Sequence, residues 1–251
     1  MKNKVKYILQ KILGFKWYLR VFALFKILIF SLDKRERDFL FFVKIIPSEG
    51  IIIDAGANIG VMSYFLSTKH SKSVVYAIEP LNENYQSINL IKLIFKLSNC
   101  ILIPKALSDE PKTLTIVMPN SGEVREQGLS HVVENDTDVE GVKFEIEADS
   151  IDGLFEKSEK TVVGIKIDVE NHEWFVLKGA EYILTHHYPI IYCELWDNEW
   201  REKCIQLMES YNYLPYVLVK DKLSLFDSNI HKTLNFFFLP LAKKALWEKY
   251  T

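Results

Sequence analysis

Cysteine is scarce in this chain, and its few cysteines are poorly arranged for cross-linking or for metal binding. Only three occur among 251 residues, at Cys100, Cys193 and Cys204, and two of them fall within predicted strands. An odd number of cysteines at wide spacing favours neither a disulfide framework nor a zinc site. We therefore expect no bound metal and a reducing, cytoplasmic environment.

An excess of charge of one sign is also missing from the chain as a whole. The formal net charge is −2, and clusters of lysine or arginine interleaved with aromatic residues are absent beyond the first 32 residues. Such a chain has no general electrostatic attraction for a polyanion. We therefore expect a small-molecule or glycan partner and no nucleic acid.

A long apolar run is missing too, even at the hydrophobic N-terminus. Val21 to Leu32 is too short to span a bilayer, Lys26 interrupts it, and no small-residue cleavage site follows. Every formal charge in residues 1–32 is positive, and the segment is amphipathic. We favour a helical cap packed on the rest of the chain. Peripheral attachment to the inner face of a membrane stays open as the alternative.

The chain as a whole has the composition of an ordinary globular protein. Hydrophobic residues make up 49% of the chain and charged residues 25%. We expect residues 1–48 to form a basic, amphipathic, helical N-terminal extension. Residues 49–251 should form the principal domain.

The most informative segment runs from Ile51 to Gly60 with the sequence IIIDAGANIG. β-Branched residues predict a buried strand, and the glycines that follow let a ligand approach the backbone closely. A dinucleotide fingerprint, G-x-G-x-x-G, would place a glycine where Asn58 stands, so a pyrophosphate is disfavoured. An acidic strand end, glycines and helix N–H groups instead suit S-adenosylmethionine. An ordinary strand-turn-helix is the alternative interpretation.

A second cofactor element follows at the expected distance. Val74 to Ile78 predicts the next parallel strand, and Pro80 ends it just after Glu79. An acid about 20 residues past the glycine turn accepts hydrogen bonds from a ribose diol in doubly wound folds. The predicted cofactor-binding residues are Asp54, Ala55, Gly56, Ala57, Asn58, Gly60, Glu79 and Ala106.

Strands and helices alternate along this region, which predicts a parallel sheet covered by helices on both faces. Helices are expected over Val61–Ser67 and Leu81–Leu97. A strand at Ile101–Ile103 follows the second helix. Near the C-terminus, Tyr216–Val219 and Asn235–Phe238 predict a closing antiparallel pair.

The alternation breaks in the middle of the chain. Thr113–Met118 and Val142–Ala148 predict two strands. A polar stretch between them predicts an inserted hairpin or lid. That stretch contains Gly122, Gly128, Ser130, His131 and Asn135.

A third polar segment, Thr161 to Glu170, predicts a central strand that ends in charged residues. Lys166, Asp168 and Glu170 alternate with apolar residues, so the three charges share one side if the strand extends that far. An ion pair between Lys166 and an acid would explain them structurally. Acids at the carboxyl edge of an open sheet also suit ligand binding. The candidate catalytic residues are Asp168, Glu170, His172 and Glu173.

Taken together, these segments resemble the FkbM-type methyltransferases. The resemblance rests on residues 54–60, Glu79-Pro80, Lys166–Glu170, Glu173, Val176–Ala180 and Ile190–Glu194, and it spans roughly residues 49–240. It implies an α/β, class I methyltransferase (Rossmann-like) fold with a doubly wound, mostly parallel seven-stranded sheet. One residue departs from the family pattern, because Asn171 stands where glycine is usual, although asparagine also tolerates positive φ.

The resemblance further implies O-methylation of a hydroxyl on a sugar, glycan or natural product, as in polysaccharide biosynthesis. A carboxylate or histidine near such a hydroxyl typically contributes about 10² to 10⁴-fold to its reaction. We favour Asp168 or Glu170 for this role. Two alternatives remain: a non-catalytic S-adenosylmethionine-binding or membrane-surface scaffold, and a nicotinamide oxidoreductase, which the glycine pattern disfavours.

Overall fold

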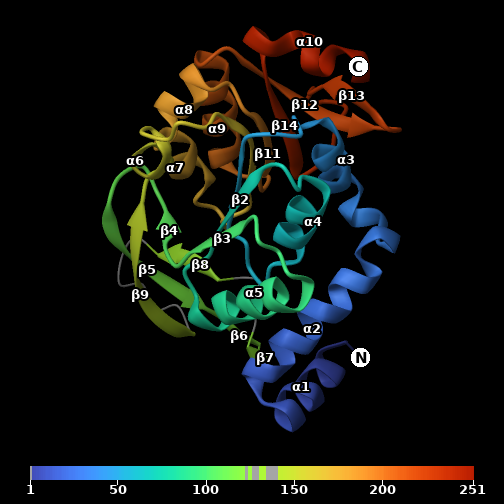
Figure 1. Cartoon of the computed structure of the whole chain (residues 1–251), viewed down its shortest axis with the longest axis vertical. Coiled ribbons are helices and arrows are strands. Elements are labelled where there is room, and N and C mark those ends of the chain that lie inside the picture. The colour runs from blue at the N-terminus through green and yellow to red at the C-terminus, as the bar shows by residue number, and fades with distance from the viewer. Residues whose placement is uncertain (1, 122–123, 126–129, 134–140) are drawn as a thin grey trace.

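The computed structural model describes residues 2–121, 124–125, 130–133 and 141–251 of the chain (Figure 1). Three residues of the predicted insertion, Gly122, Gly128 and Asn135, lie outside these ranges. The helices are α1 (Lys2–Leu13), α2 (Phe15–Ile29), α3 (Arg37–Ile45), α4 (Val61–Lys69), α5 (Asn82–Phe95), α6 (Ile151–Phe155), α7 (Glu173–Lys178), α8 (Glu181–His186), α9 (Glu199–Ser210) and α10 (Lys244–Trp247).

A mixed, mostly parallel sheet runs through the centre of the fold. In spatial order its strands are β13 (Lys222–Leu225), β12 (Tyr213–Val219), β14 (Asn235–Pro240), β11 (Ile190–Glu194), β10 (Val162–Ile167), β1 (Ile51–Ala55), β2 (Val74–Ile78) and β3 (Cys100–Ile103). Five neighbouring strands, β3, β2, β1, β10 and β11, are parallel to one another. β14 pairs antiparallel with both β11 and β12. The predicted closing pair is therefore present.

The sheet has one strand more than the seven that we predicted. β13 adds to the outer edge as the second half of a hairpin with β12. Its two turn residues, Lys220 and Asp221, adopt positive φ angles of 49° and 67°, which short hairpin turns require. Glycine or asparagine usually marks such turns, so this turn carried no recognisable sequence signal.

Helices cover both faces of this sheet, as its apolar strands require. Along β1, Ile52 packs on one side with α2, α3, α4 and α5, whereas Ile51 and Ile53 pack on the other with α6, α7, α8 and α9. This alternation follows from the two-residue period of a strand. β1 lies between β10 and β2, so its carboxyl end opens into the middle of the sheet edge.

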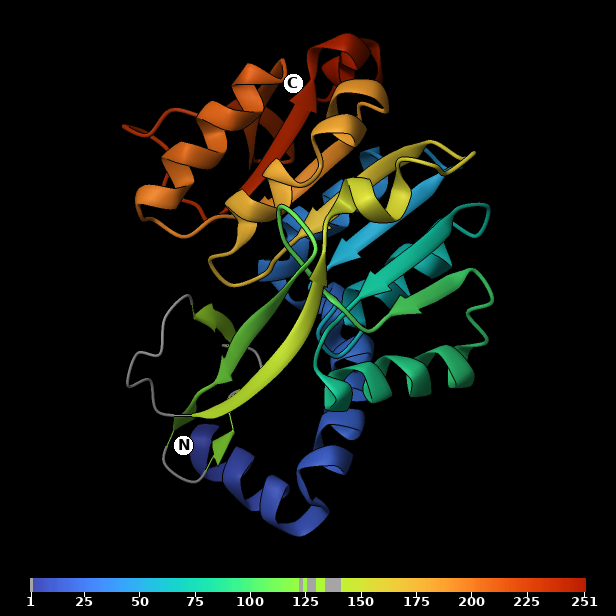
Figure 2. The ribbon, with the colours of Figure 1, turned by 90° about the vertical axis from the view of Figure 1, so that its left-hand side faces the viewer.

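The inserted segment forms a second sheet beside the first. Its strands are β4 (Ala106–Leu107), β9 (Val142–Asp149), β5 (Lys112–Met118) and β8 (His131–Val133), and β6 (Asn120–Ser121) pairs separately with β7 (Val124–Arg125). β5 and β9 contain the two strands that the sequence predicts, and they form a long antiparallel pair. In Figure 2, β1 and β2 point toward the side on which β5 and β9 lie. The insertion thus stands over the carboxyl ends of the central strands.

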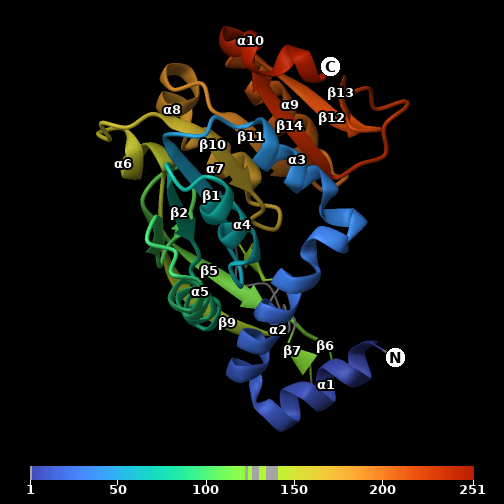
Figure 3. The same ribbon diagram turned by 45° about the vertical axis from the view of Figure 1, so that its right-hand side comes forward.

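Helix α2 packs against the helical layer of the domain, and α1 packs against α2 and β7. α2 buries Tyr18, Leu19, Ala23 and Ile27 in the cluster that also contains residues of α4 and α5 (Figure 3). In the described part of the chain, no helix combines the length and apolar character needed to cross a bilayer.

Candidate active site

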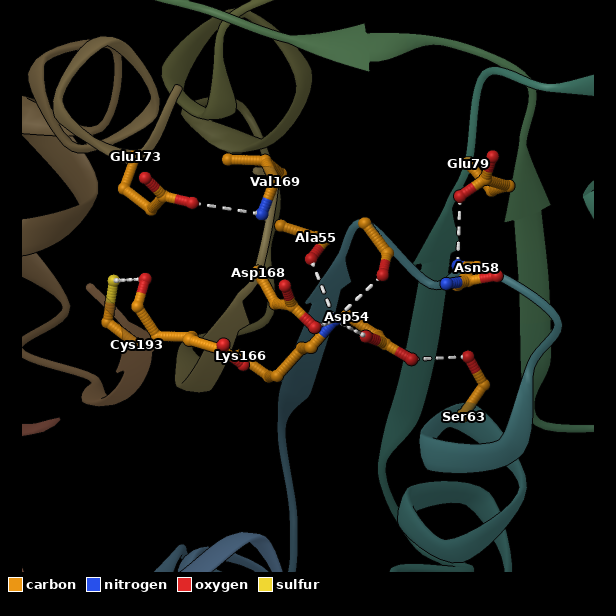
Figure 4. A network of polar contacts seen from close by, with 12 residues as sticks. Asp54, Ala55, Asn58, Ser63, Glu79, Lys166, Asp168, Val169, Glu173 and Cys193 are labelled. Atoms are coloured by element: carbon orange, nitrogen blue, oxygen red, sulfur yellow. Dashed lines mark hydrogen bonds and ion pairs between the residues drawn. The ribbon is translucent and has the colours of Figure 1, made fainter. Parts of the chain in front are cut away.

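Lys166 is the buried centre of a polar network at the carboxyl ends of β1 and β10 (Figure 4). Its ammonium group donates to the carbonyl oxygens of Ala55 at 3.1 Å and Gly56 at 2.7 Å. Asp54 Oδ1 lies 3.3 Å away and Asp168 Oδ2 3.6 Å away. Burial acts to lower the pKa of Lys166, but the two carboxylates outweigh it and raise that pKa above its usual value. The ion pair that we considered is therefore present, and it joins the two strand ends.

Asp54 lies beneath the glycine loop. The residue is fully buried, and its carboxylate accepts a hydrogen bond from Ser63 in α4 besides facing Lys166. This pairing holds the end of β1, the loop and the following helix together. Through these contacts Asp54 supports the loop from below, whereas we expected its side chain at the ligand.

Gly56 and Gly60 let this loop pack closely against its neighbours. Gly56 has φ of 72°, and a Cβ atom there would lie 2.0 Å from the carbonyl oxygen of Asp168. Gly60 has φ of 86°, and its Cβ would approach Ile88 of α5 at 3.0 Å. Any L-residue would strain the backbone at both positions. Close packing within the protein therefore explains why glycine stands at both positions, whether or not a ligand binds.

The N–H groups of the loop are largely used within the protein. Those of Gly56 and Ala57 donate to the carbonyl oxygen of Ile78 at 3.1 and 3.0 Å, and that of Asn58 donates to Glu79. Any bound carboxylate would need to use N–H groups beyond Asn58. The N–H groups that could bind a ligand carboxylate are therefore those in the first turn of α4, where helix N–H groups have no partner within the helix.

Glu79 is buried at the end of β2 and is held by three donors. Its carboxylate accepts from the N–H groups of Asn58 at 2.8 Å and Leu81 at 3.0 Å, and from the amide of Asn84 at 3.1 Å. Burial raises its pKa to about 7, although these hydrogen bonds oppose the shift. A carboxylate offers about four acceptor sites, so Glu79 retains capacity for a further donor.

Two more acceptors lie beside Glu79. The side-chain oxygens of Asn58 and Asn84 are buried and have no hydrogen-bond partner within the described residues. A buried unsatisfied acceptor costs about 1–3 kcal/mol, so such groups normally meet a ligand or water. The three side chains together present a wall that can accept several hydrogen bonds from one molecule with adjacent hydroxyl groups.

These side chains line one cleft, which has a volume of about 680 Å³ including its open mouth. The described residues that line it come from both sheets: Gly56, Asn58, Ile78, Glu79, Pro80, Leu81, Asn84, Lys105, Ala106, Leu107, Ile116, Ser130, Val132, Asp168, Val169, Glu170 and His172. The cleft therefore unites the glycine loop, the end of β2, the insertion and the acids after β10.

The strand that carries Lys166 stops earlier than its alternating pattern suggested. β10 ends at Ile167, and Glu170 and Asn171 follow in the left-handed region with φ of 52° and 71°. The condition for placing Lys166, Asp168 and Glu170 on one side, a strand that continues to Glu170, is therefore not met. A tight turn instead brings both Asp168 and Glu170 to the cleft.

Asn171 fits this turn. Asparagine adopts the left-handed region more readily than most residues. Its side-chain oxygen also accepts a hydrogen bond of 2.7 Å from Asn198, which caps the start of α9. The residue that departs from the family pattern thus keeps the backbone shape that a glycine would provide.

Among the acids that line the cleft, Glu170 has the pKa that departs most from its ordinary value. Burial raises its pKa to about 8, and the negative charges of Asp168, Glu194 and Glu173 contribute to the shift. Glu194 lies at the end of β11, and burial together with Asp168 raises its pKa to about 7. Glu170 lines the cleft, whereas Glu194 is not part of the described cleft wall.

His172 also lines the cleft and is neutral at physiological pH. Burial lowers its pKa to about 4, and the nearby charge of Lys112 contributes. Its Nε2 lies 2.9 Å from the hydroxyl of Ser108, and its ring stacks on Phe175 at 4.5 Å between centroids. These contacts fix the ring in the wall.

Glu173 has a different position from the other three candidate catalytic residues. Its carboxylate is buried and accepts from the N–H groups of Val169 and Asn171, both at 3.2 Å. Burial raises its pKa to about 7. The contacts make Glu173 a clamp on the turn that carries Asp168 and Glu170, outside the described cleft wall.

The sequence pattern did not single out several residues of the cleft. Asn84 lies in the first turn of α5, five residues after Glu79, and that position could have identified it. Lys105 and Val132 come from segments around the insertion. Only the fold of the second sheet brings them to the carboxyl ends of β1 and β2.

The residues present fit S-adenosylmethionine. Glu79 and the two unsatisfied amide oxygens can accept hydrogen bonds from a ribose diol and an adenine amino group. Apolar side chains, including Leu81, Leu107 and Ile116, can cover the flat faces of the base. At the opposite end of the cleft, the acids after β10 can face a positively charged sulfonium.

The chain is similar to several solved structures, of which the first supports the fold. A methyltransferase FkbM from Methylobacillus flagellatus KT matches with a TM-score of 0.51 and 16% identity, over 76% of this chain and 44% of that chain. A SAM-dependent O-methyltransferase from Thermotoga maritima matches with a TM-score of 0.48 and 14% identity, over 81% and 64% of the two chains. Fibrillarin from Aeropyrum pernix, solved with bound S-adenosyl-L-methionine, matches with a TM-score of 0.47 and 11% identity, over 82% and 74%.

This chain spans less than half of the length of the Methylobacillus structure. A comparison with proteins of curated function gave no match. The predicted class I methyltransferase fold is nevertheless confirmed by the structure and its similarity to that protein.

The sequence profile of the Methyltransferase FkbM domain matches residues 54–218, about two thirds of the chain. The matched region begins at Asp54 and includes Glu79 and the charged segment from Lys166 to Glu170. The match also supports S-adenosylmethionine, the predicted cofactor. The chain therefore belongs to the FkbM methyltransferase domain family.

Proposed function

We propose that the protein is an S-adenosylmethionine-dependent O-methyltransferase that acts on a hydroxyl of a sugar, glycan or related natural product, as in polysaccharide biosynthesis. One observation carries the proposal. Asp168 and Glu170 line the same cleft as Gly56, Asn58 and Glu79, so an acceptor beside the two acids lies next to the cofactor wall. The proposed acceptor hydroxyl would approach from the side of the insertion.

The chain would bind the cofactor through the wall formed by Asn58, Glu79 and Asn84. Glu79 and the two amide oxygens would orient the ribose and the base. S-Adenosylmethionine supplies both the methyl group and its own leaving group when bound. The main task of the protein is then to align the acceptor oxygen with the methyl carbon.

Glu170 would accept the proton of the acceptor hydroxyl. A general base works best when its pKa lies near the working pH, and the pKa of about 8 at Glu170 meets this condition. Asp168 lies 3.6 Å from the Lys166 ammonium group, so Lys166 would hold its carboxylate in place beside the acceptor. Glu173 would position both acids by clamping the turn. His172 would orient the acceptor as a neutral group.

A reducing cytoplasmic location completes the proposal. Cys100, Cys193 and Cys204 are free thiols buried within the fold. Burial raises the pKa values of all three thiols, which keeps them protonated.

Labelled methyl transfer tests the proposed function. Purified protein and S-adenosylmethionine with a labelled methyl group would be incubated with glycan and lipid extracts of the source cell, and mass spectrometry would identify the product. We expect label in one hydroxyl-bearing molecule, and labelling about 10² to 10⁴-fold slower with the Glu170→Gln variant. Saturable S-adenosylmethionine binding without transfer to any acceptor would instead support the non-catalytic scaffold. Tighter binding of NAD than of S-adenosylmethionine would support the oxidoreductase.

A further inference from the structure

Helix α2 is apolar on two faces, and only one of them is covered. Tyr18, Leu19, Ala23 and Ile27 are buried against the domain. On the other side, Trp17, Val21, Phe25 and Leu28 are exposed, with 58% of Trp17 and 78% of Leu28 accessible to solvent. A helix that is apolar all round is normally buried on all sides. The uncovered face therefore indicates a partner that the isolated chain lacks.

The exposed residues form one continuous stripe. Successive α-helical residues are turned by about 100°, so positions 17, 21, 25 and 28 fall within an arc of roughly 80°. Helix α1, which packs against α2, also exposes the apolar side chains of Ile8, Leu9 and Ile12. We call these seven side chains the N-terminal face. An exposed apolar surface of this kind marks an interaction site.

The charges that residues 1–32 themselves carry have one sign, although Lys26 is paired with Asp33 and Glu36 from the segment that follows. Residues 1–32 contain seven lysine and arginine residues and no acidic residue. The Arg20 guanidinium lies 4.8 Å from the ring centroid of Trp17, and the Lys11 ammonium lies 5.6 Å from that of Tyr7. Helices with basic residues flanking aromatic and aliphatic side chains are typical of those that lie in the headgroup region of a membrane.

We propose that the N-terminal face docks on an anionic membrane surface. Charge complementarity selects this occupant. In a symmetric pair of copies joined through this face, the basic N-terminal segments of the two copies would face each other, which is unfavourable. Because the whole chain has a net charge of −2 and this segment +7, the remainder carries −9. An anionic surface therefore attracts the N-terminal face and repels the rest of the protein, which orients the molecule.

The docking surface is joined to the cleft by packing. Phe15, at the start of α2, packs against the hydrophobic cluster that contains Leu81, Ala106 and Ile116. Those three residues also line the cleft. Docking would thus hold the cleft wall close to the lipid, and the acceptor hydroxyl would be carried by a membrane-anchored molecule. This last statement on the acceptor rests on the proposed function.

Vesicle flotation tests the docking surface with the full chain. The vesicles would consist of phosphatidylcholine with or without phosphatidylglycerol, and the triple variant Trp17→Ser/Phe25→Ser/Leu28→Ser would remove the centre of the face. Leu225→Ser/Ile230→Ser, in and just after β13, is the matched control because both side chains are exposed and apolar. We expect wild type and control to bind only the anionic vesicles, more weakly at high salt, and the triple variant to bind about tenfold or more weakly.

The outcomes distinguish a membrane from a second copy of the chain as the partner of this face, and they test the docking proposal separately from the proposed function. Equal flotation of all three proteins, or no flotation of the wild type, would overturn the docking proposal. So would a concentration-dependent dimer, detected by sedimentation, that the triple variant abolishes. Calorimetric titration with S-adenosylmethionine on the same samples tests the cofactor independently. Vesicle binding without cofactor binding would refute the proposed function alone, whereas label transferred only to water-soluble acceptors would refute the membrane-anchored acceptor.

Discussion

Lys166 holds Asp54 across the boundary between β10 and β1, with 3.3 Å between the ammonium nitrogen and the carboxylate oxygen. Both side chains are buried, and the same ammonium group also binds two carbonyl oxygens of the glycine loop. The loop that shapes the cofactor side of the cleft therefore depends on one cation. Several consequences of this arrangement can be measured.

Lys166→Met should destabilise the protein strongly. Removing one partner of a buried ion pair leaves an uncompensated charge, here Asp54, and typically costs about 3–5 kcal/mol. Urea denaturation measures the loss in the free energy of unfolding. The control is Lys178→Met, which removes an exposed pair with Asp109 and should cost less than about 1 kcal/mol. Equal losses in both variants would contradict the assigned role of Lys166.

Glu79→Gln should weaken binding of S-adenosylhomocysteine by roughly 10- to 100-fold, because a hydrogen bond to a charged group contributes about 1.5–3 kcal/mol. A ligand hydroxyl donates best to the ionised carboxylate, and the pKa of Glu79 is about 7. The dissociation constant of the wild type should therefore fall as pH rises from 6 to 8. Calorimetry should show no such trend for Glu79→Gln. The neighbouring Glu83→Gln variant should behave as wild type.

Glu170→Gln should lower kcat by about 10² to 10⁴-fold, the usual contribution of a general base. The dissociation constant for S-adenosylmethionine should change by less than about threefold, since Glu79, Asn58 and Asn84 are the residues proposed to bind the nucleoside and they are unchanged in this variant. The base must be ionised, so kcat of the wild type should rise with pH up to about 8. Glu194→Gln, which changes an acid outside the described cleft wall, is the control. Full turnover by Glu170→Gln would show that another group accepts the proton.

The stability of the ligand-free protein should fall between pH 6.5 and 8.5. The unfolded chain has lost the Glu170 proton well below this range, at the ordinary pKa of 4.5, whereas the folded chain keeps it up to about 8. The folded state thus binds more protons, and the free energy of unfolding decreases as pH rises. His172 acts in the opposite direction, but only between its folded pKa of about 4 and 6.5.

The expected decrease from Glu170 is on the order of 1 kcal/mol, after allowance for its partial exposure to solvent. Chemical denaturation at several pH values would measure it. Glu170→Gln should reduce the decrease, whereas Glu79, Glu173 and Glu194, whose pKa values burial raises to about 7, should keep the rest of it. A wild-type profile that rises over this range would contradict the raised pKa.

Asn171→Gly should keep activity within about threefold, because glycine adopts the observed φ of 71° without strain. Asn171→Val should lose about 1–2 kcal/mol of stability, since a β-branched residue is strained in the left-handed region. Thermal unfolding and turnover would be compared for both variants. Similar behaviour of the two would show that the turn does not depend on this backbone conformation.

The sequence predicted the parts of the fold that have short-range signals. Apolar runs marked β1, β2 and β10, and the glycines of the loop that follows β1 marked its turn. The turn after β10 was harder to predict. The pattern of Lys166, Asp168 and Glu170 suggested a longer strand, but positive φ angles at Glu170 and Asn171 end it. Neither residue is a glycine, so the turn has no obvious sequence marker.

The candidate site was predictable in its members more than in their roles. Asp168, Glu170, His172 and Glu79 do line one cleft. Asp54 and Glu173, however, lie beneath it and bind Lys166 or backbone N–H groups. Whether an acid faces a cavity or a backbone depends on contacts between segments far apart in the chain. The contribution of the insertion, through Val132 and Ser130, depends on such contacts too.

A crystal structure with S-adenosylhomocysteine tests the central claim most directly. The account predicts the ribose hydroxyls within hydrogen-bond distance of Glu79, with the sulfur directed toward Asp168 and Glu170. Density for the nucleoside in any other cavity, or a sulfur turned away from these acids, would contradict it.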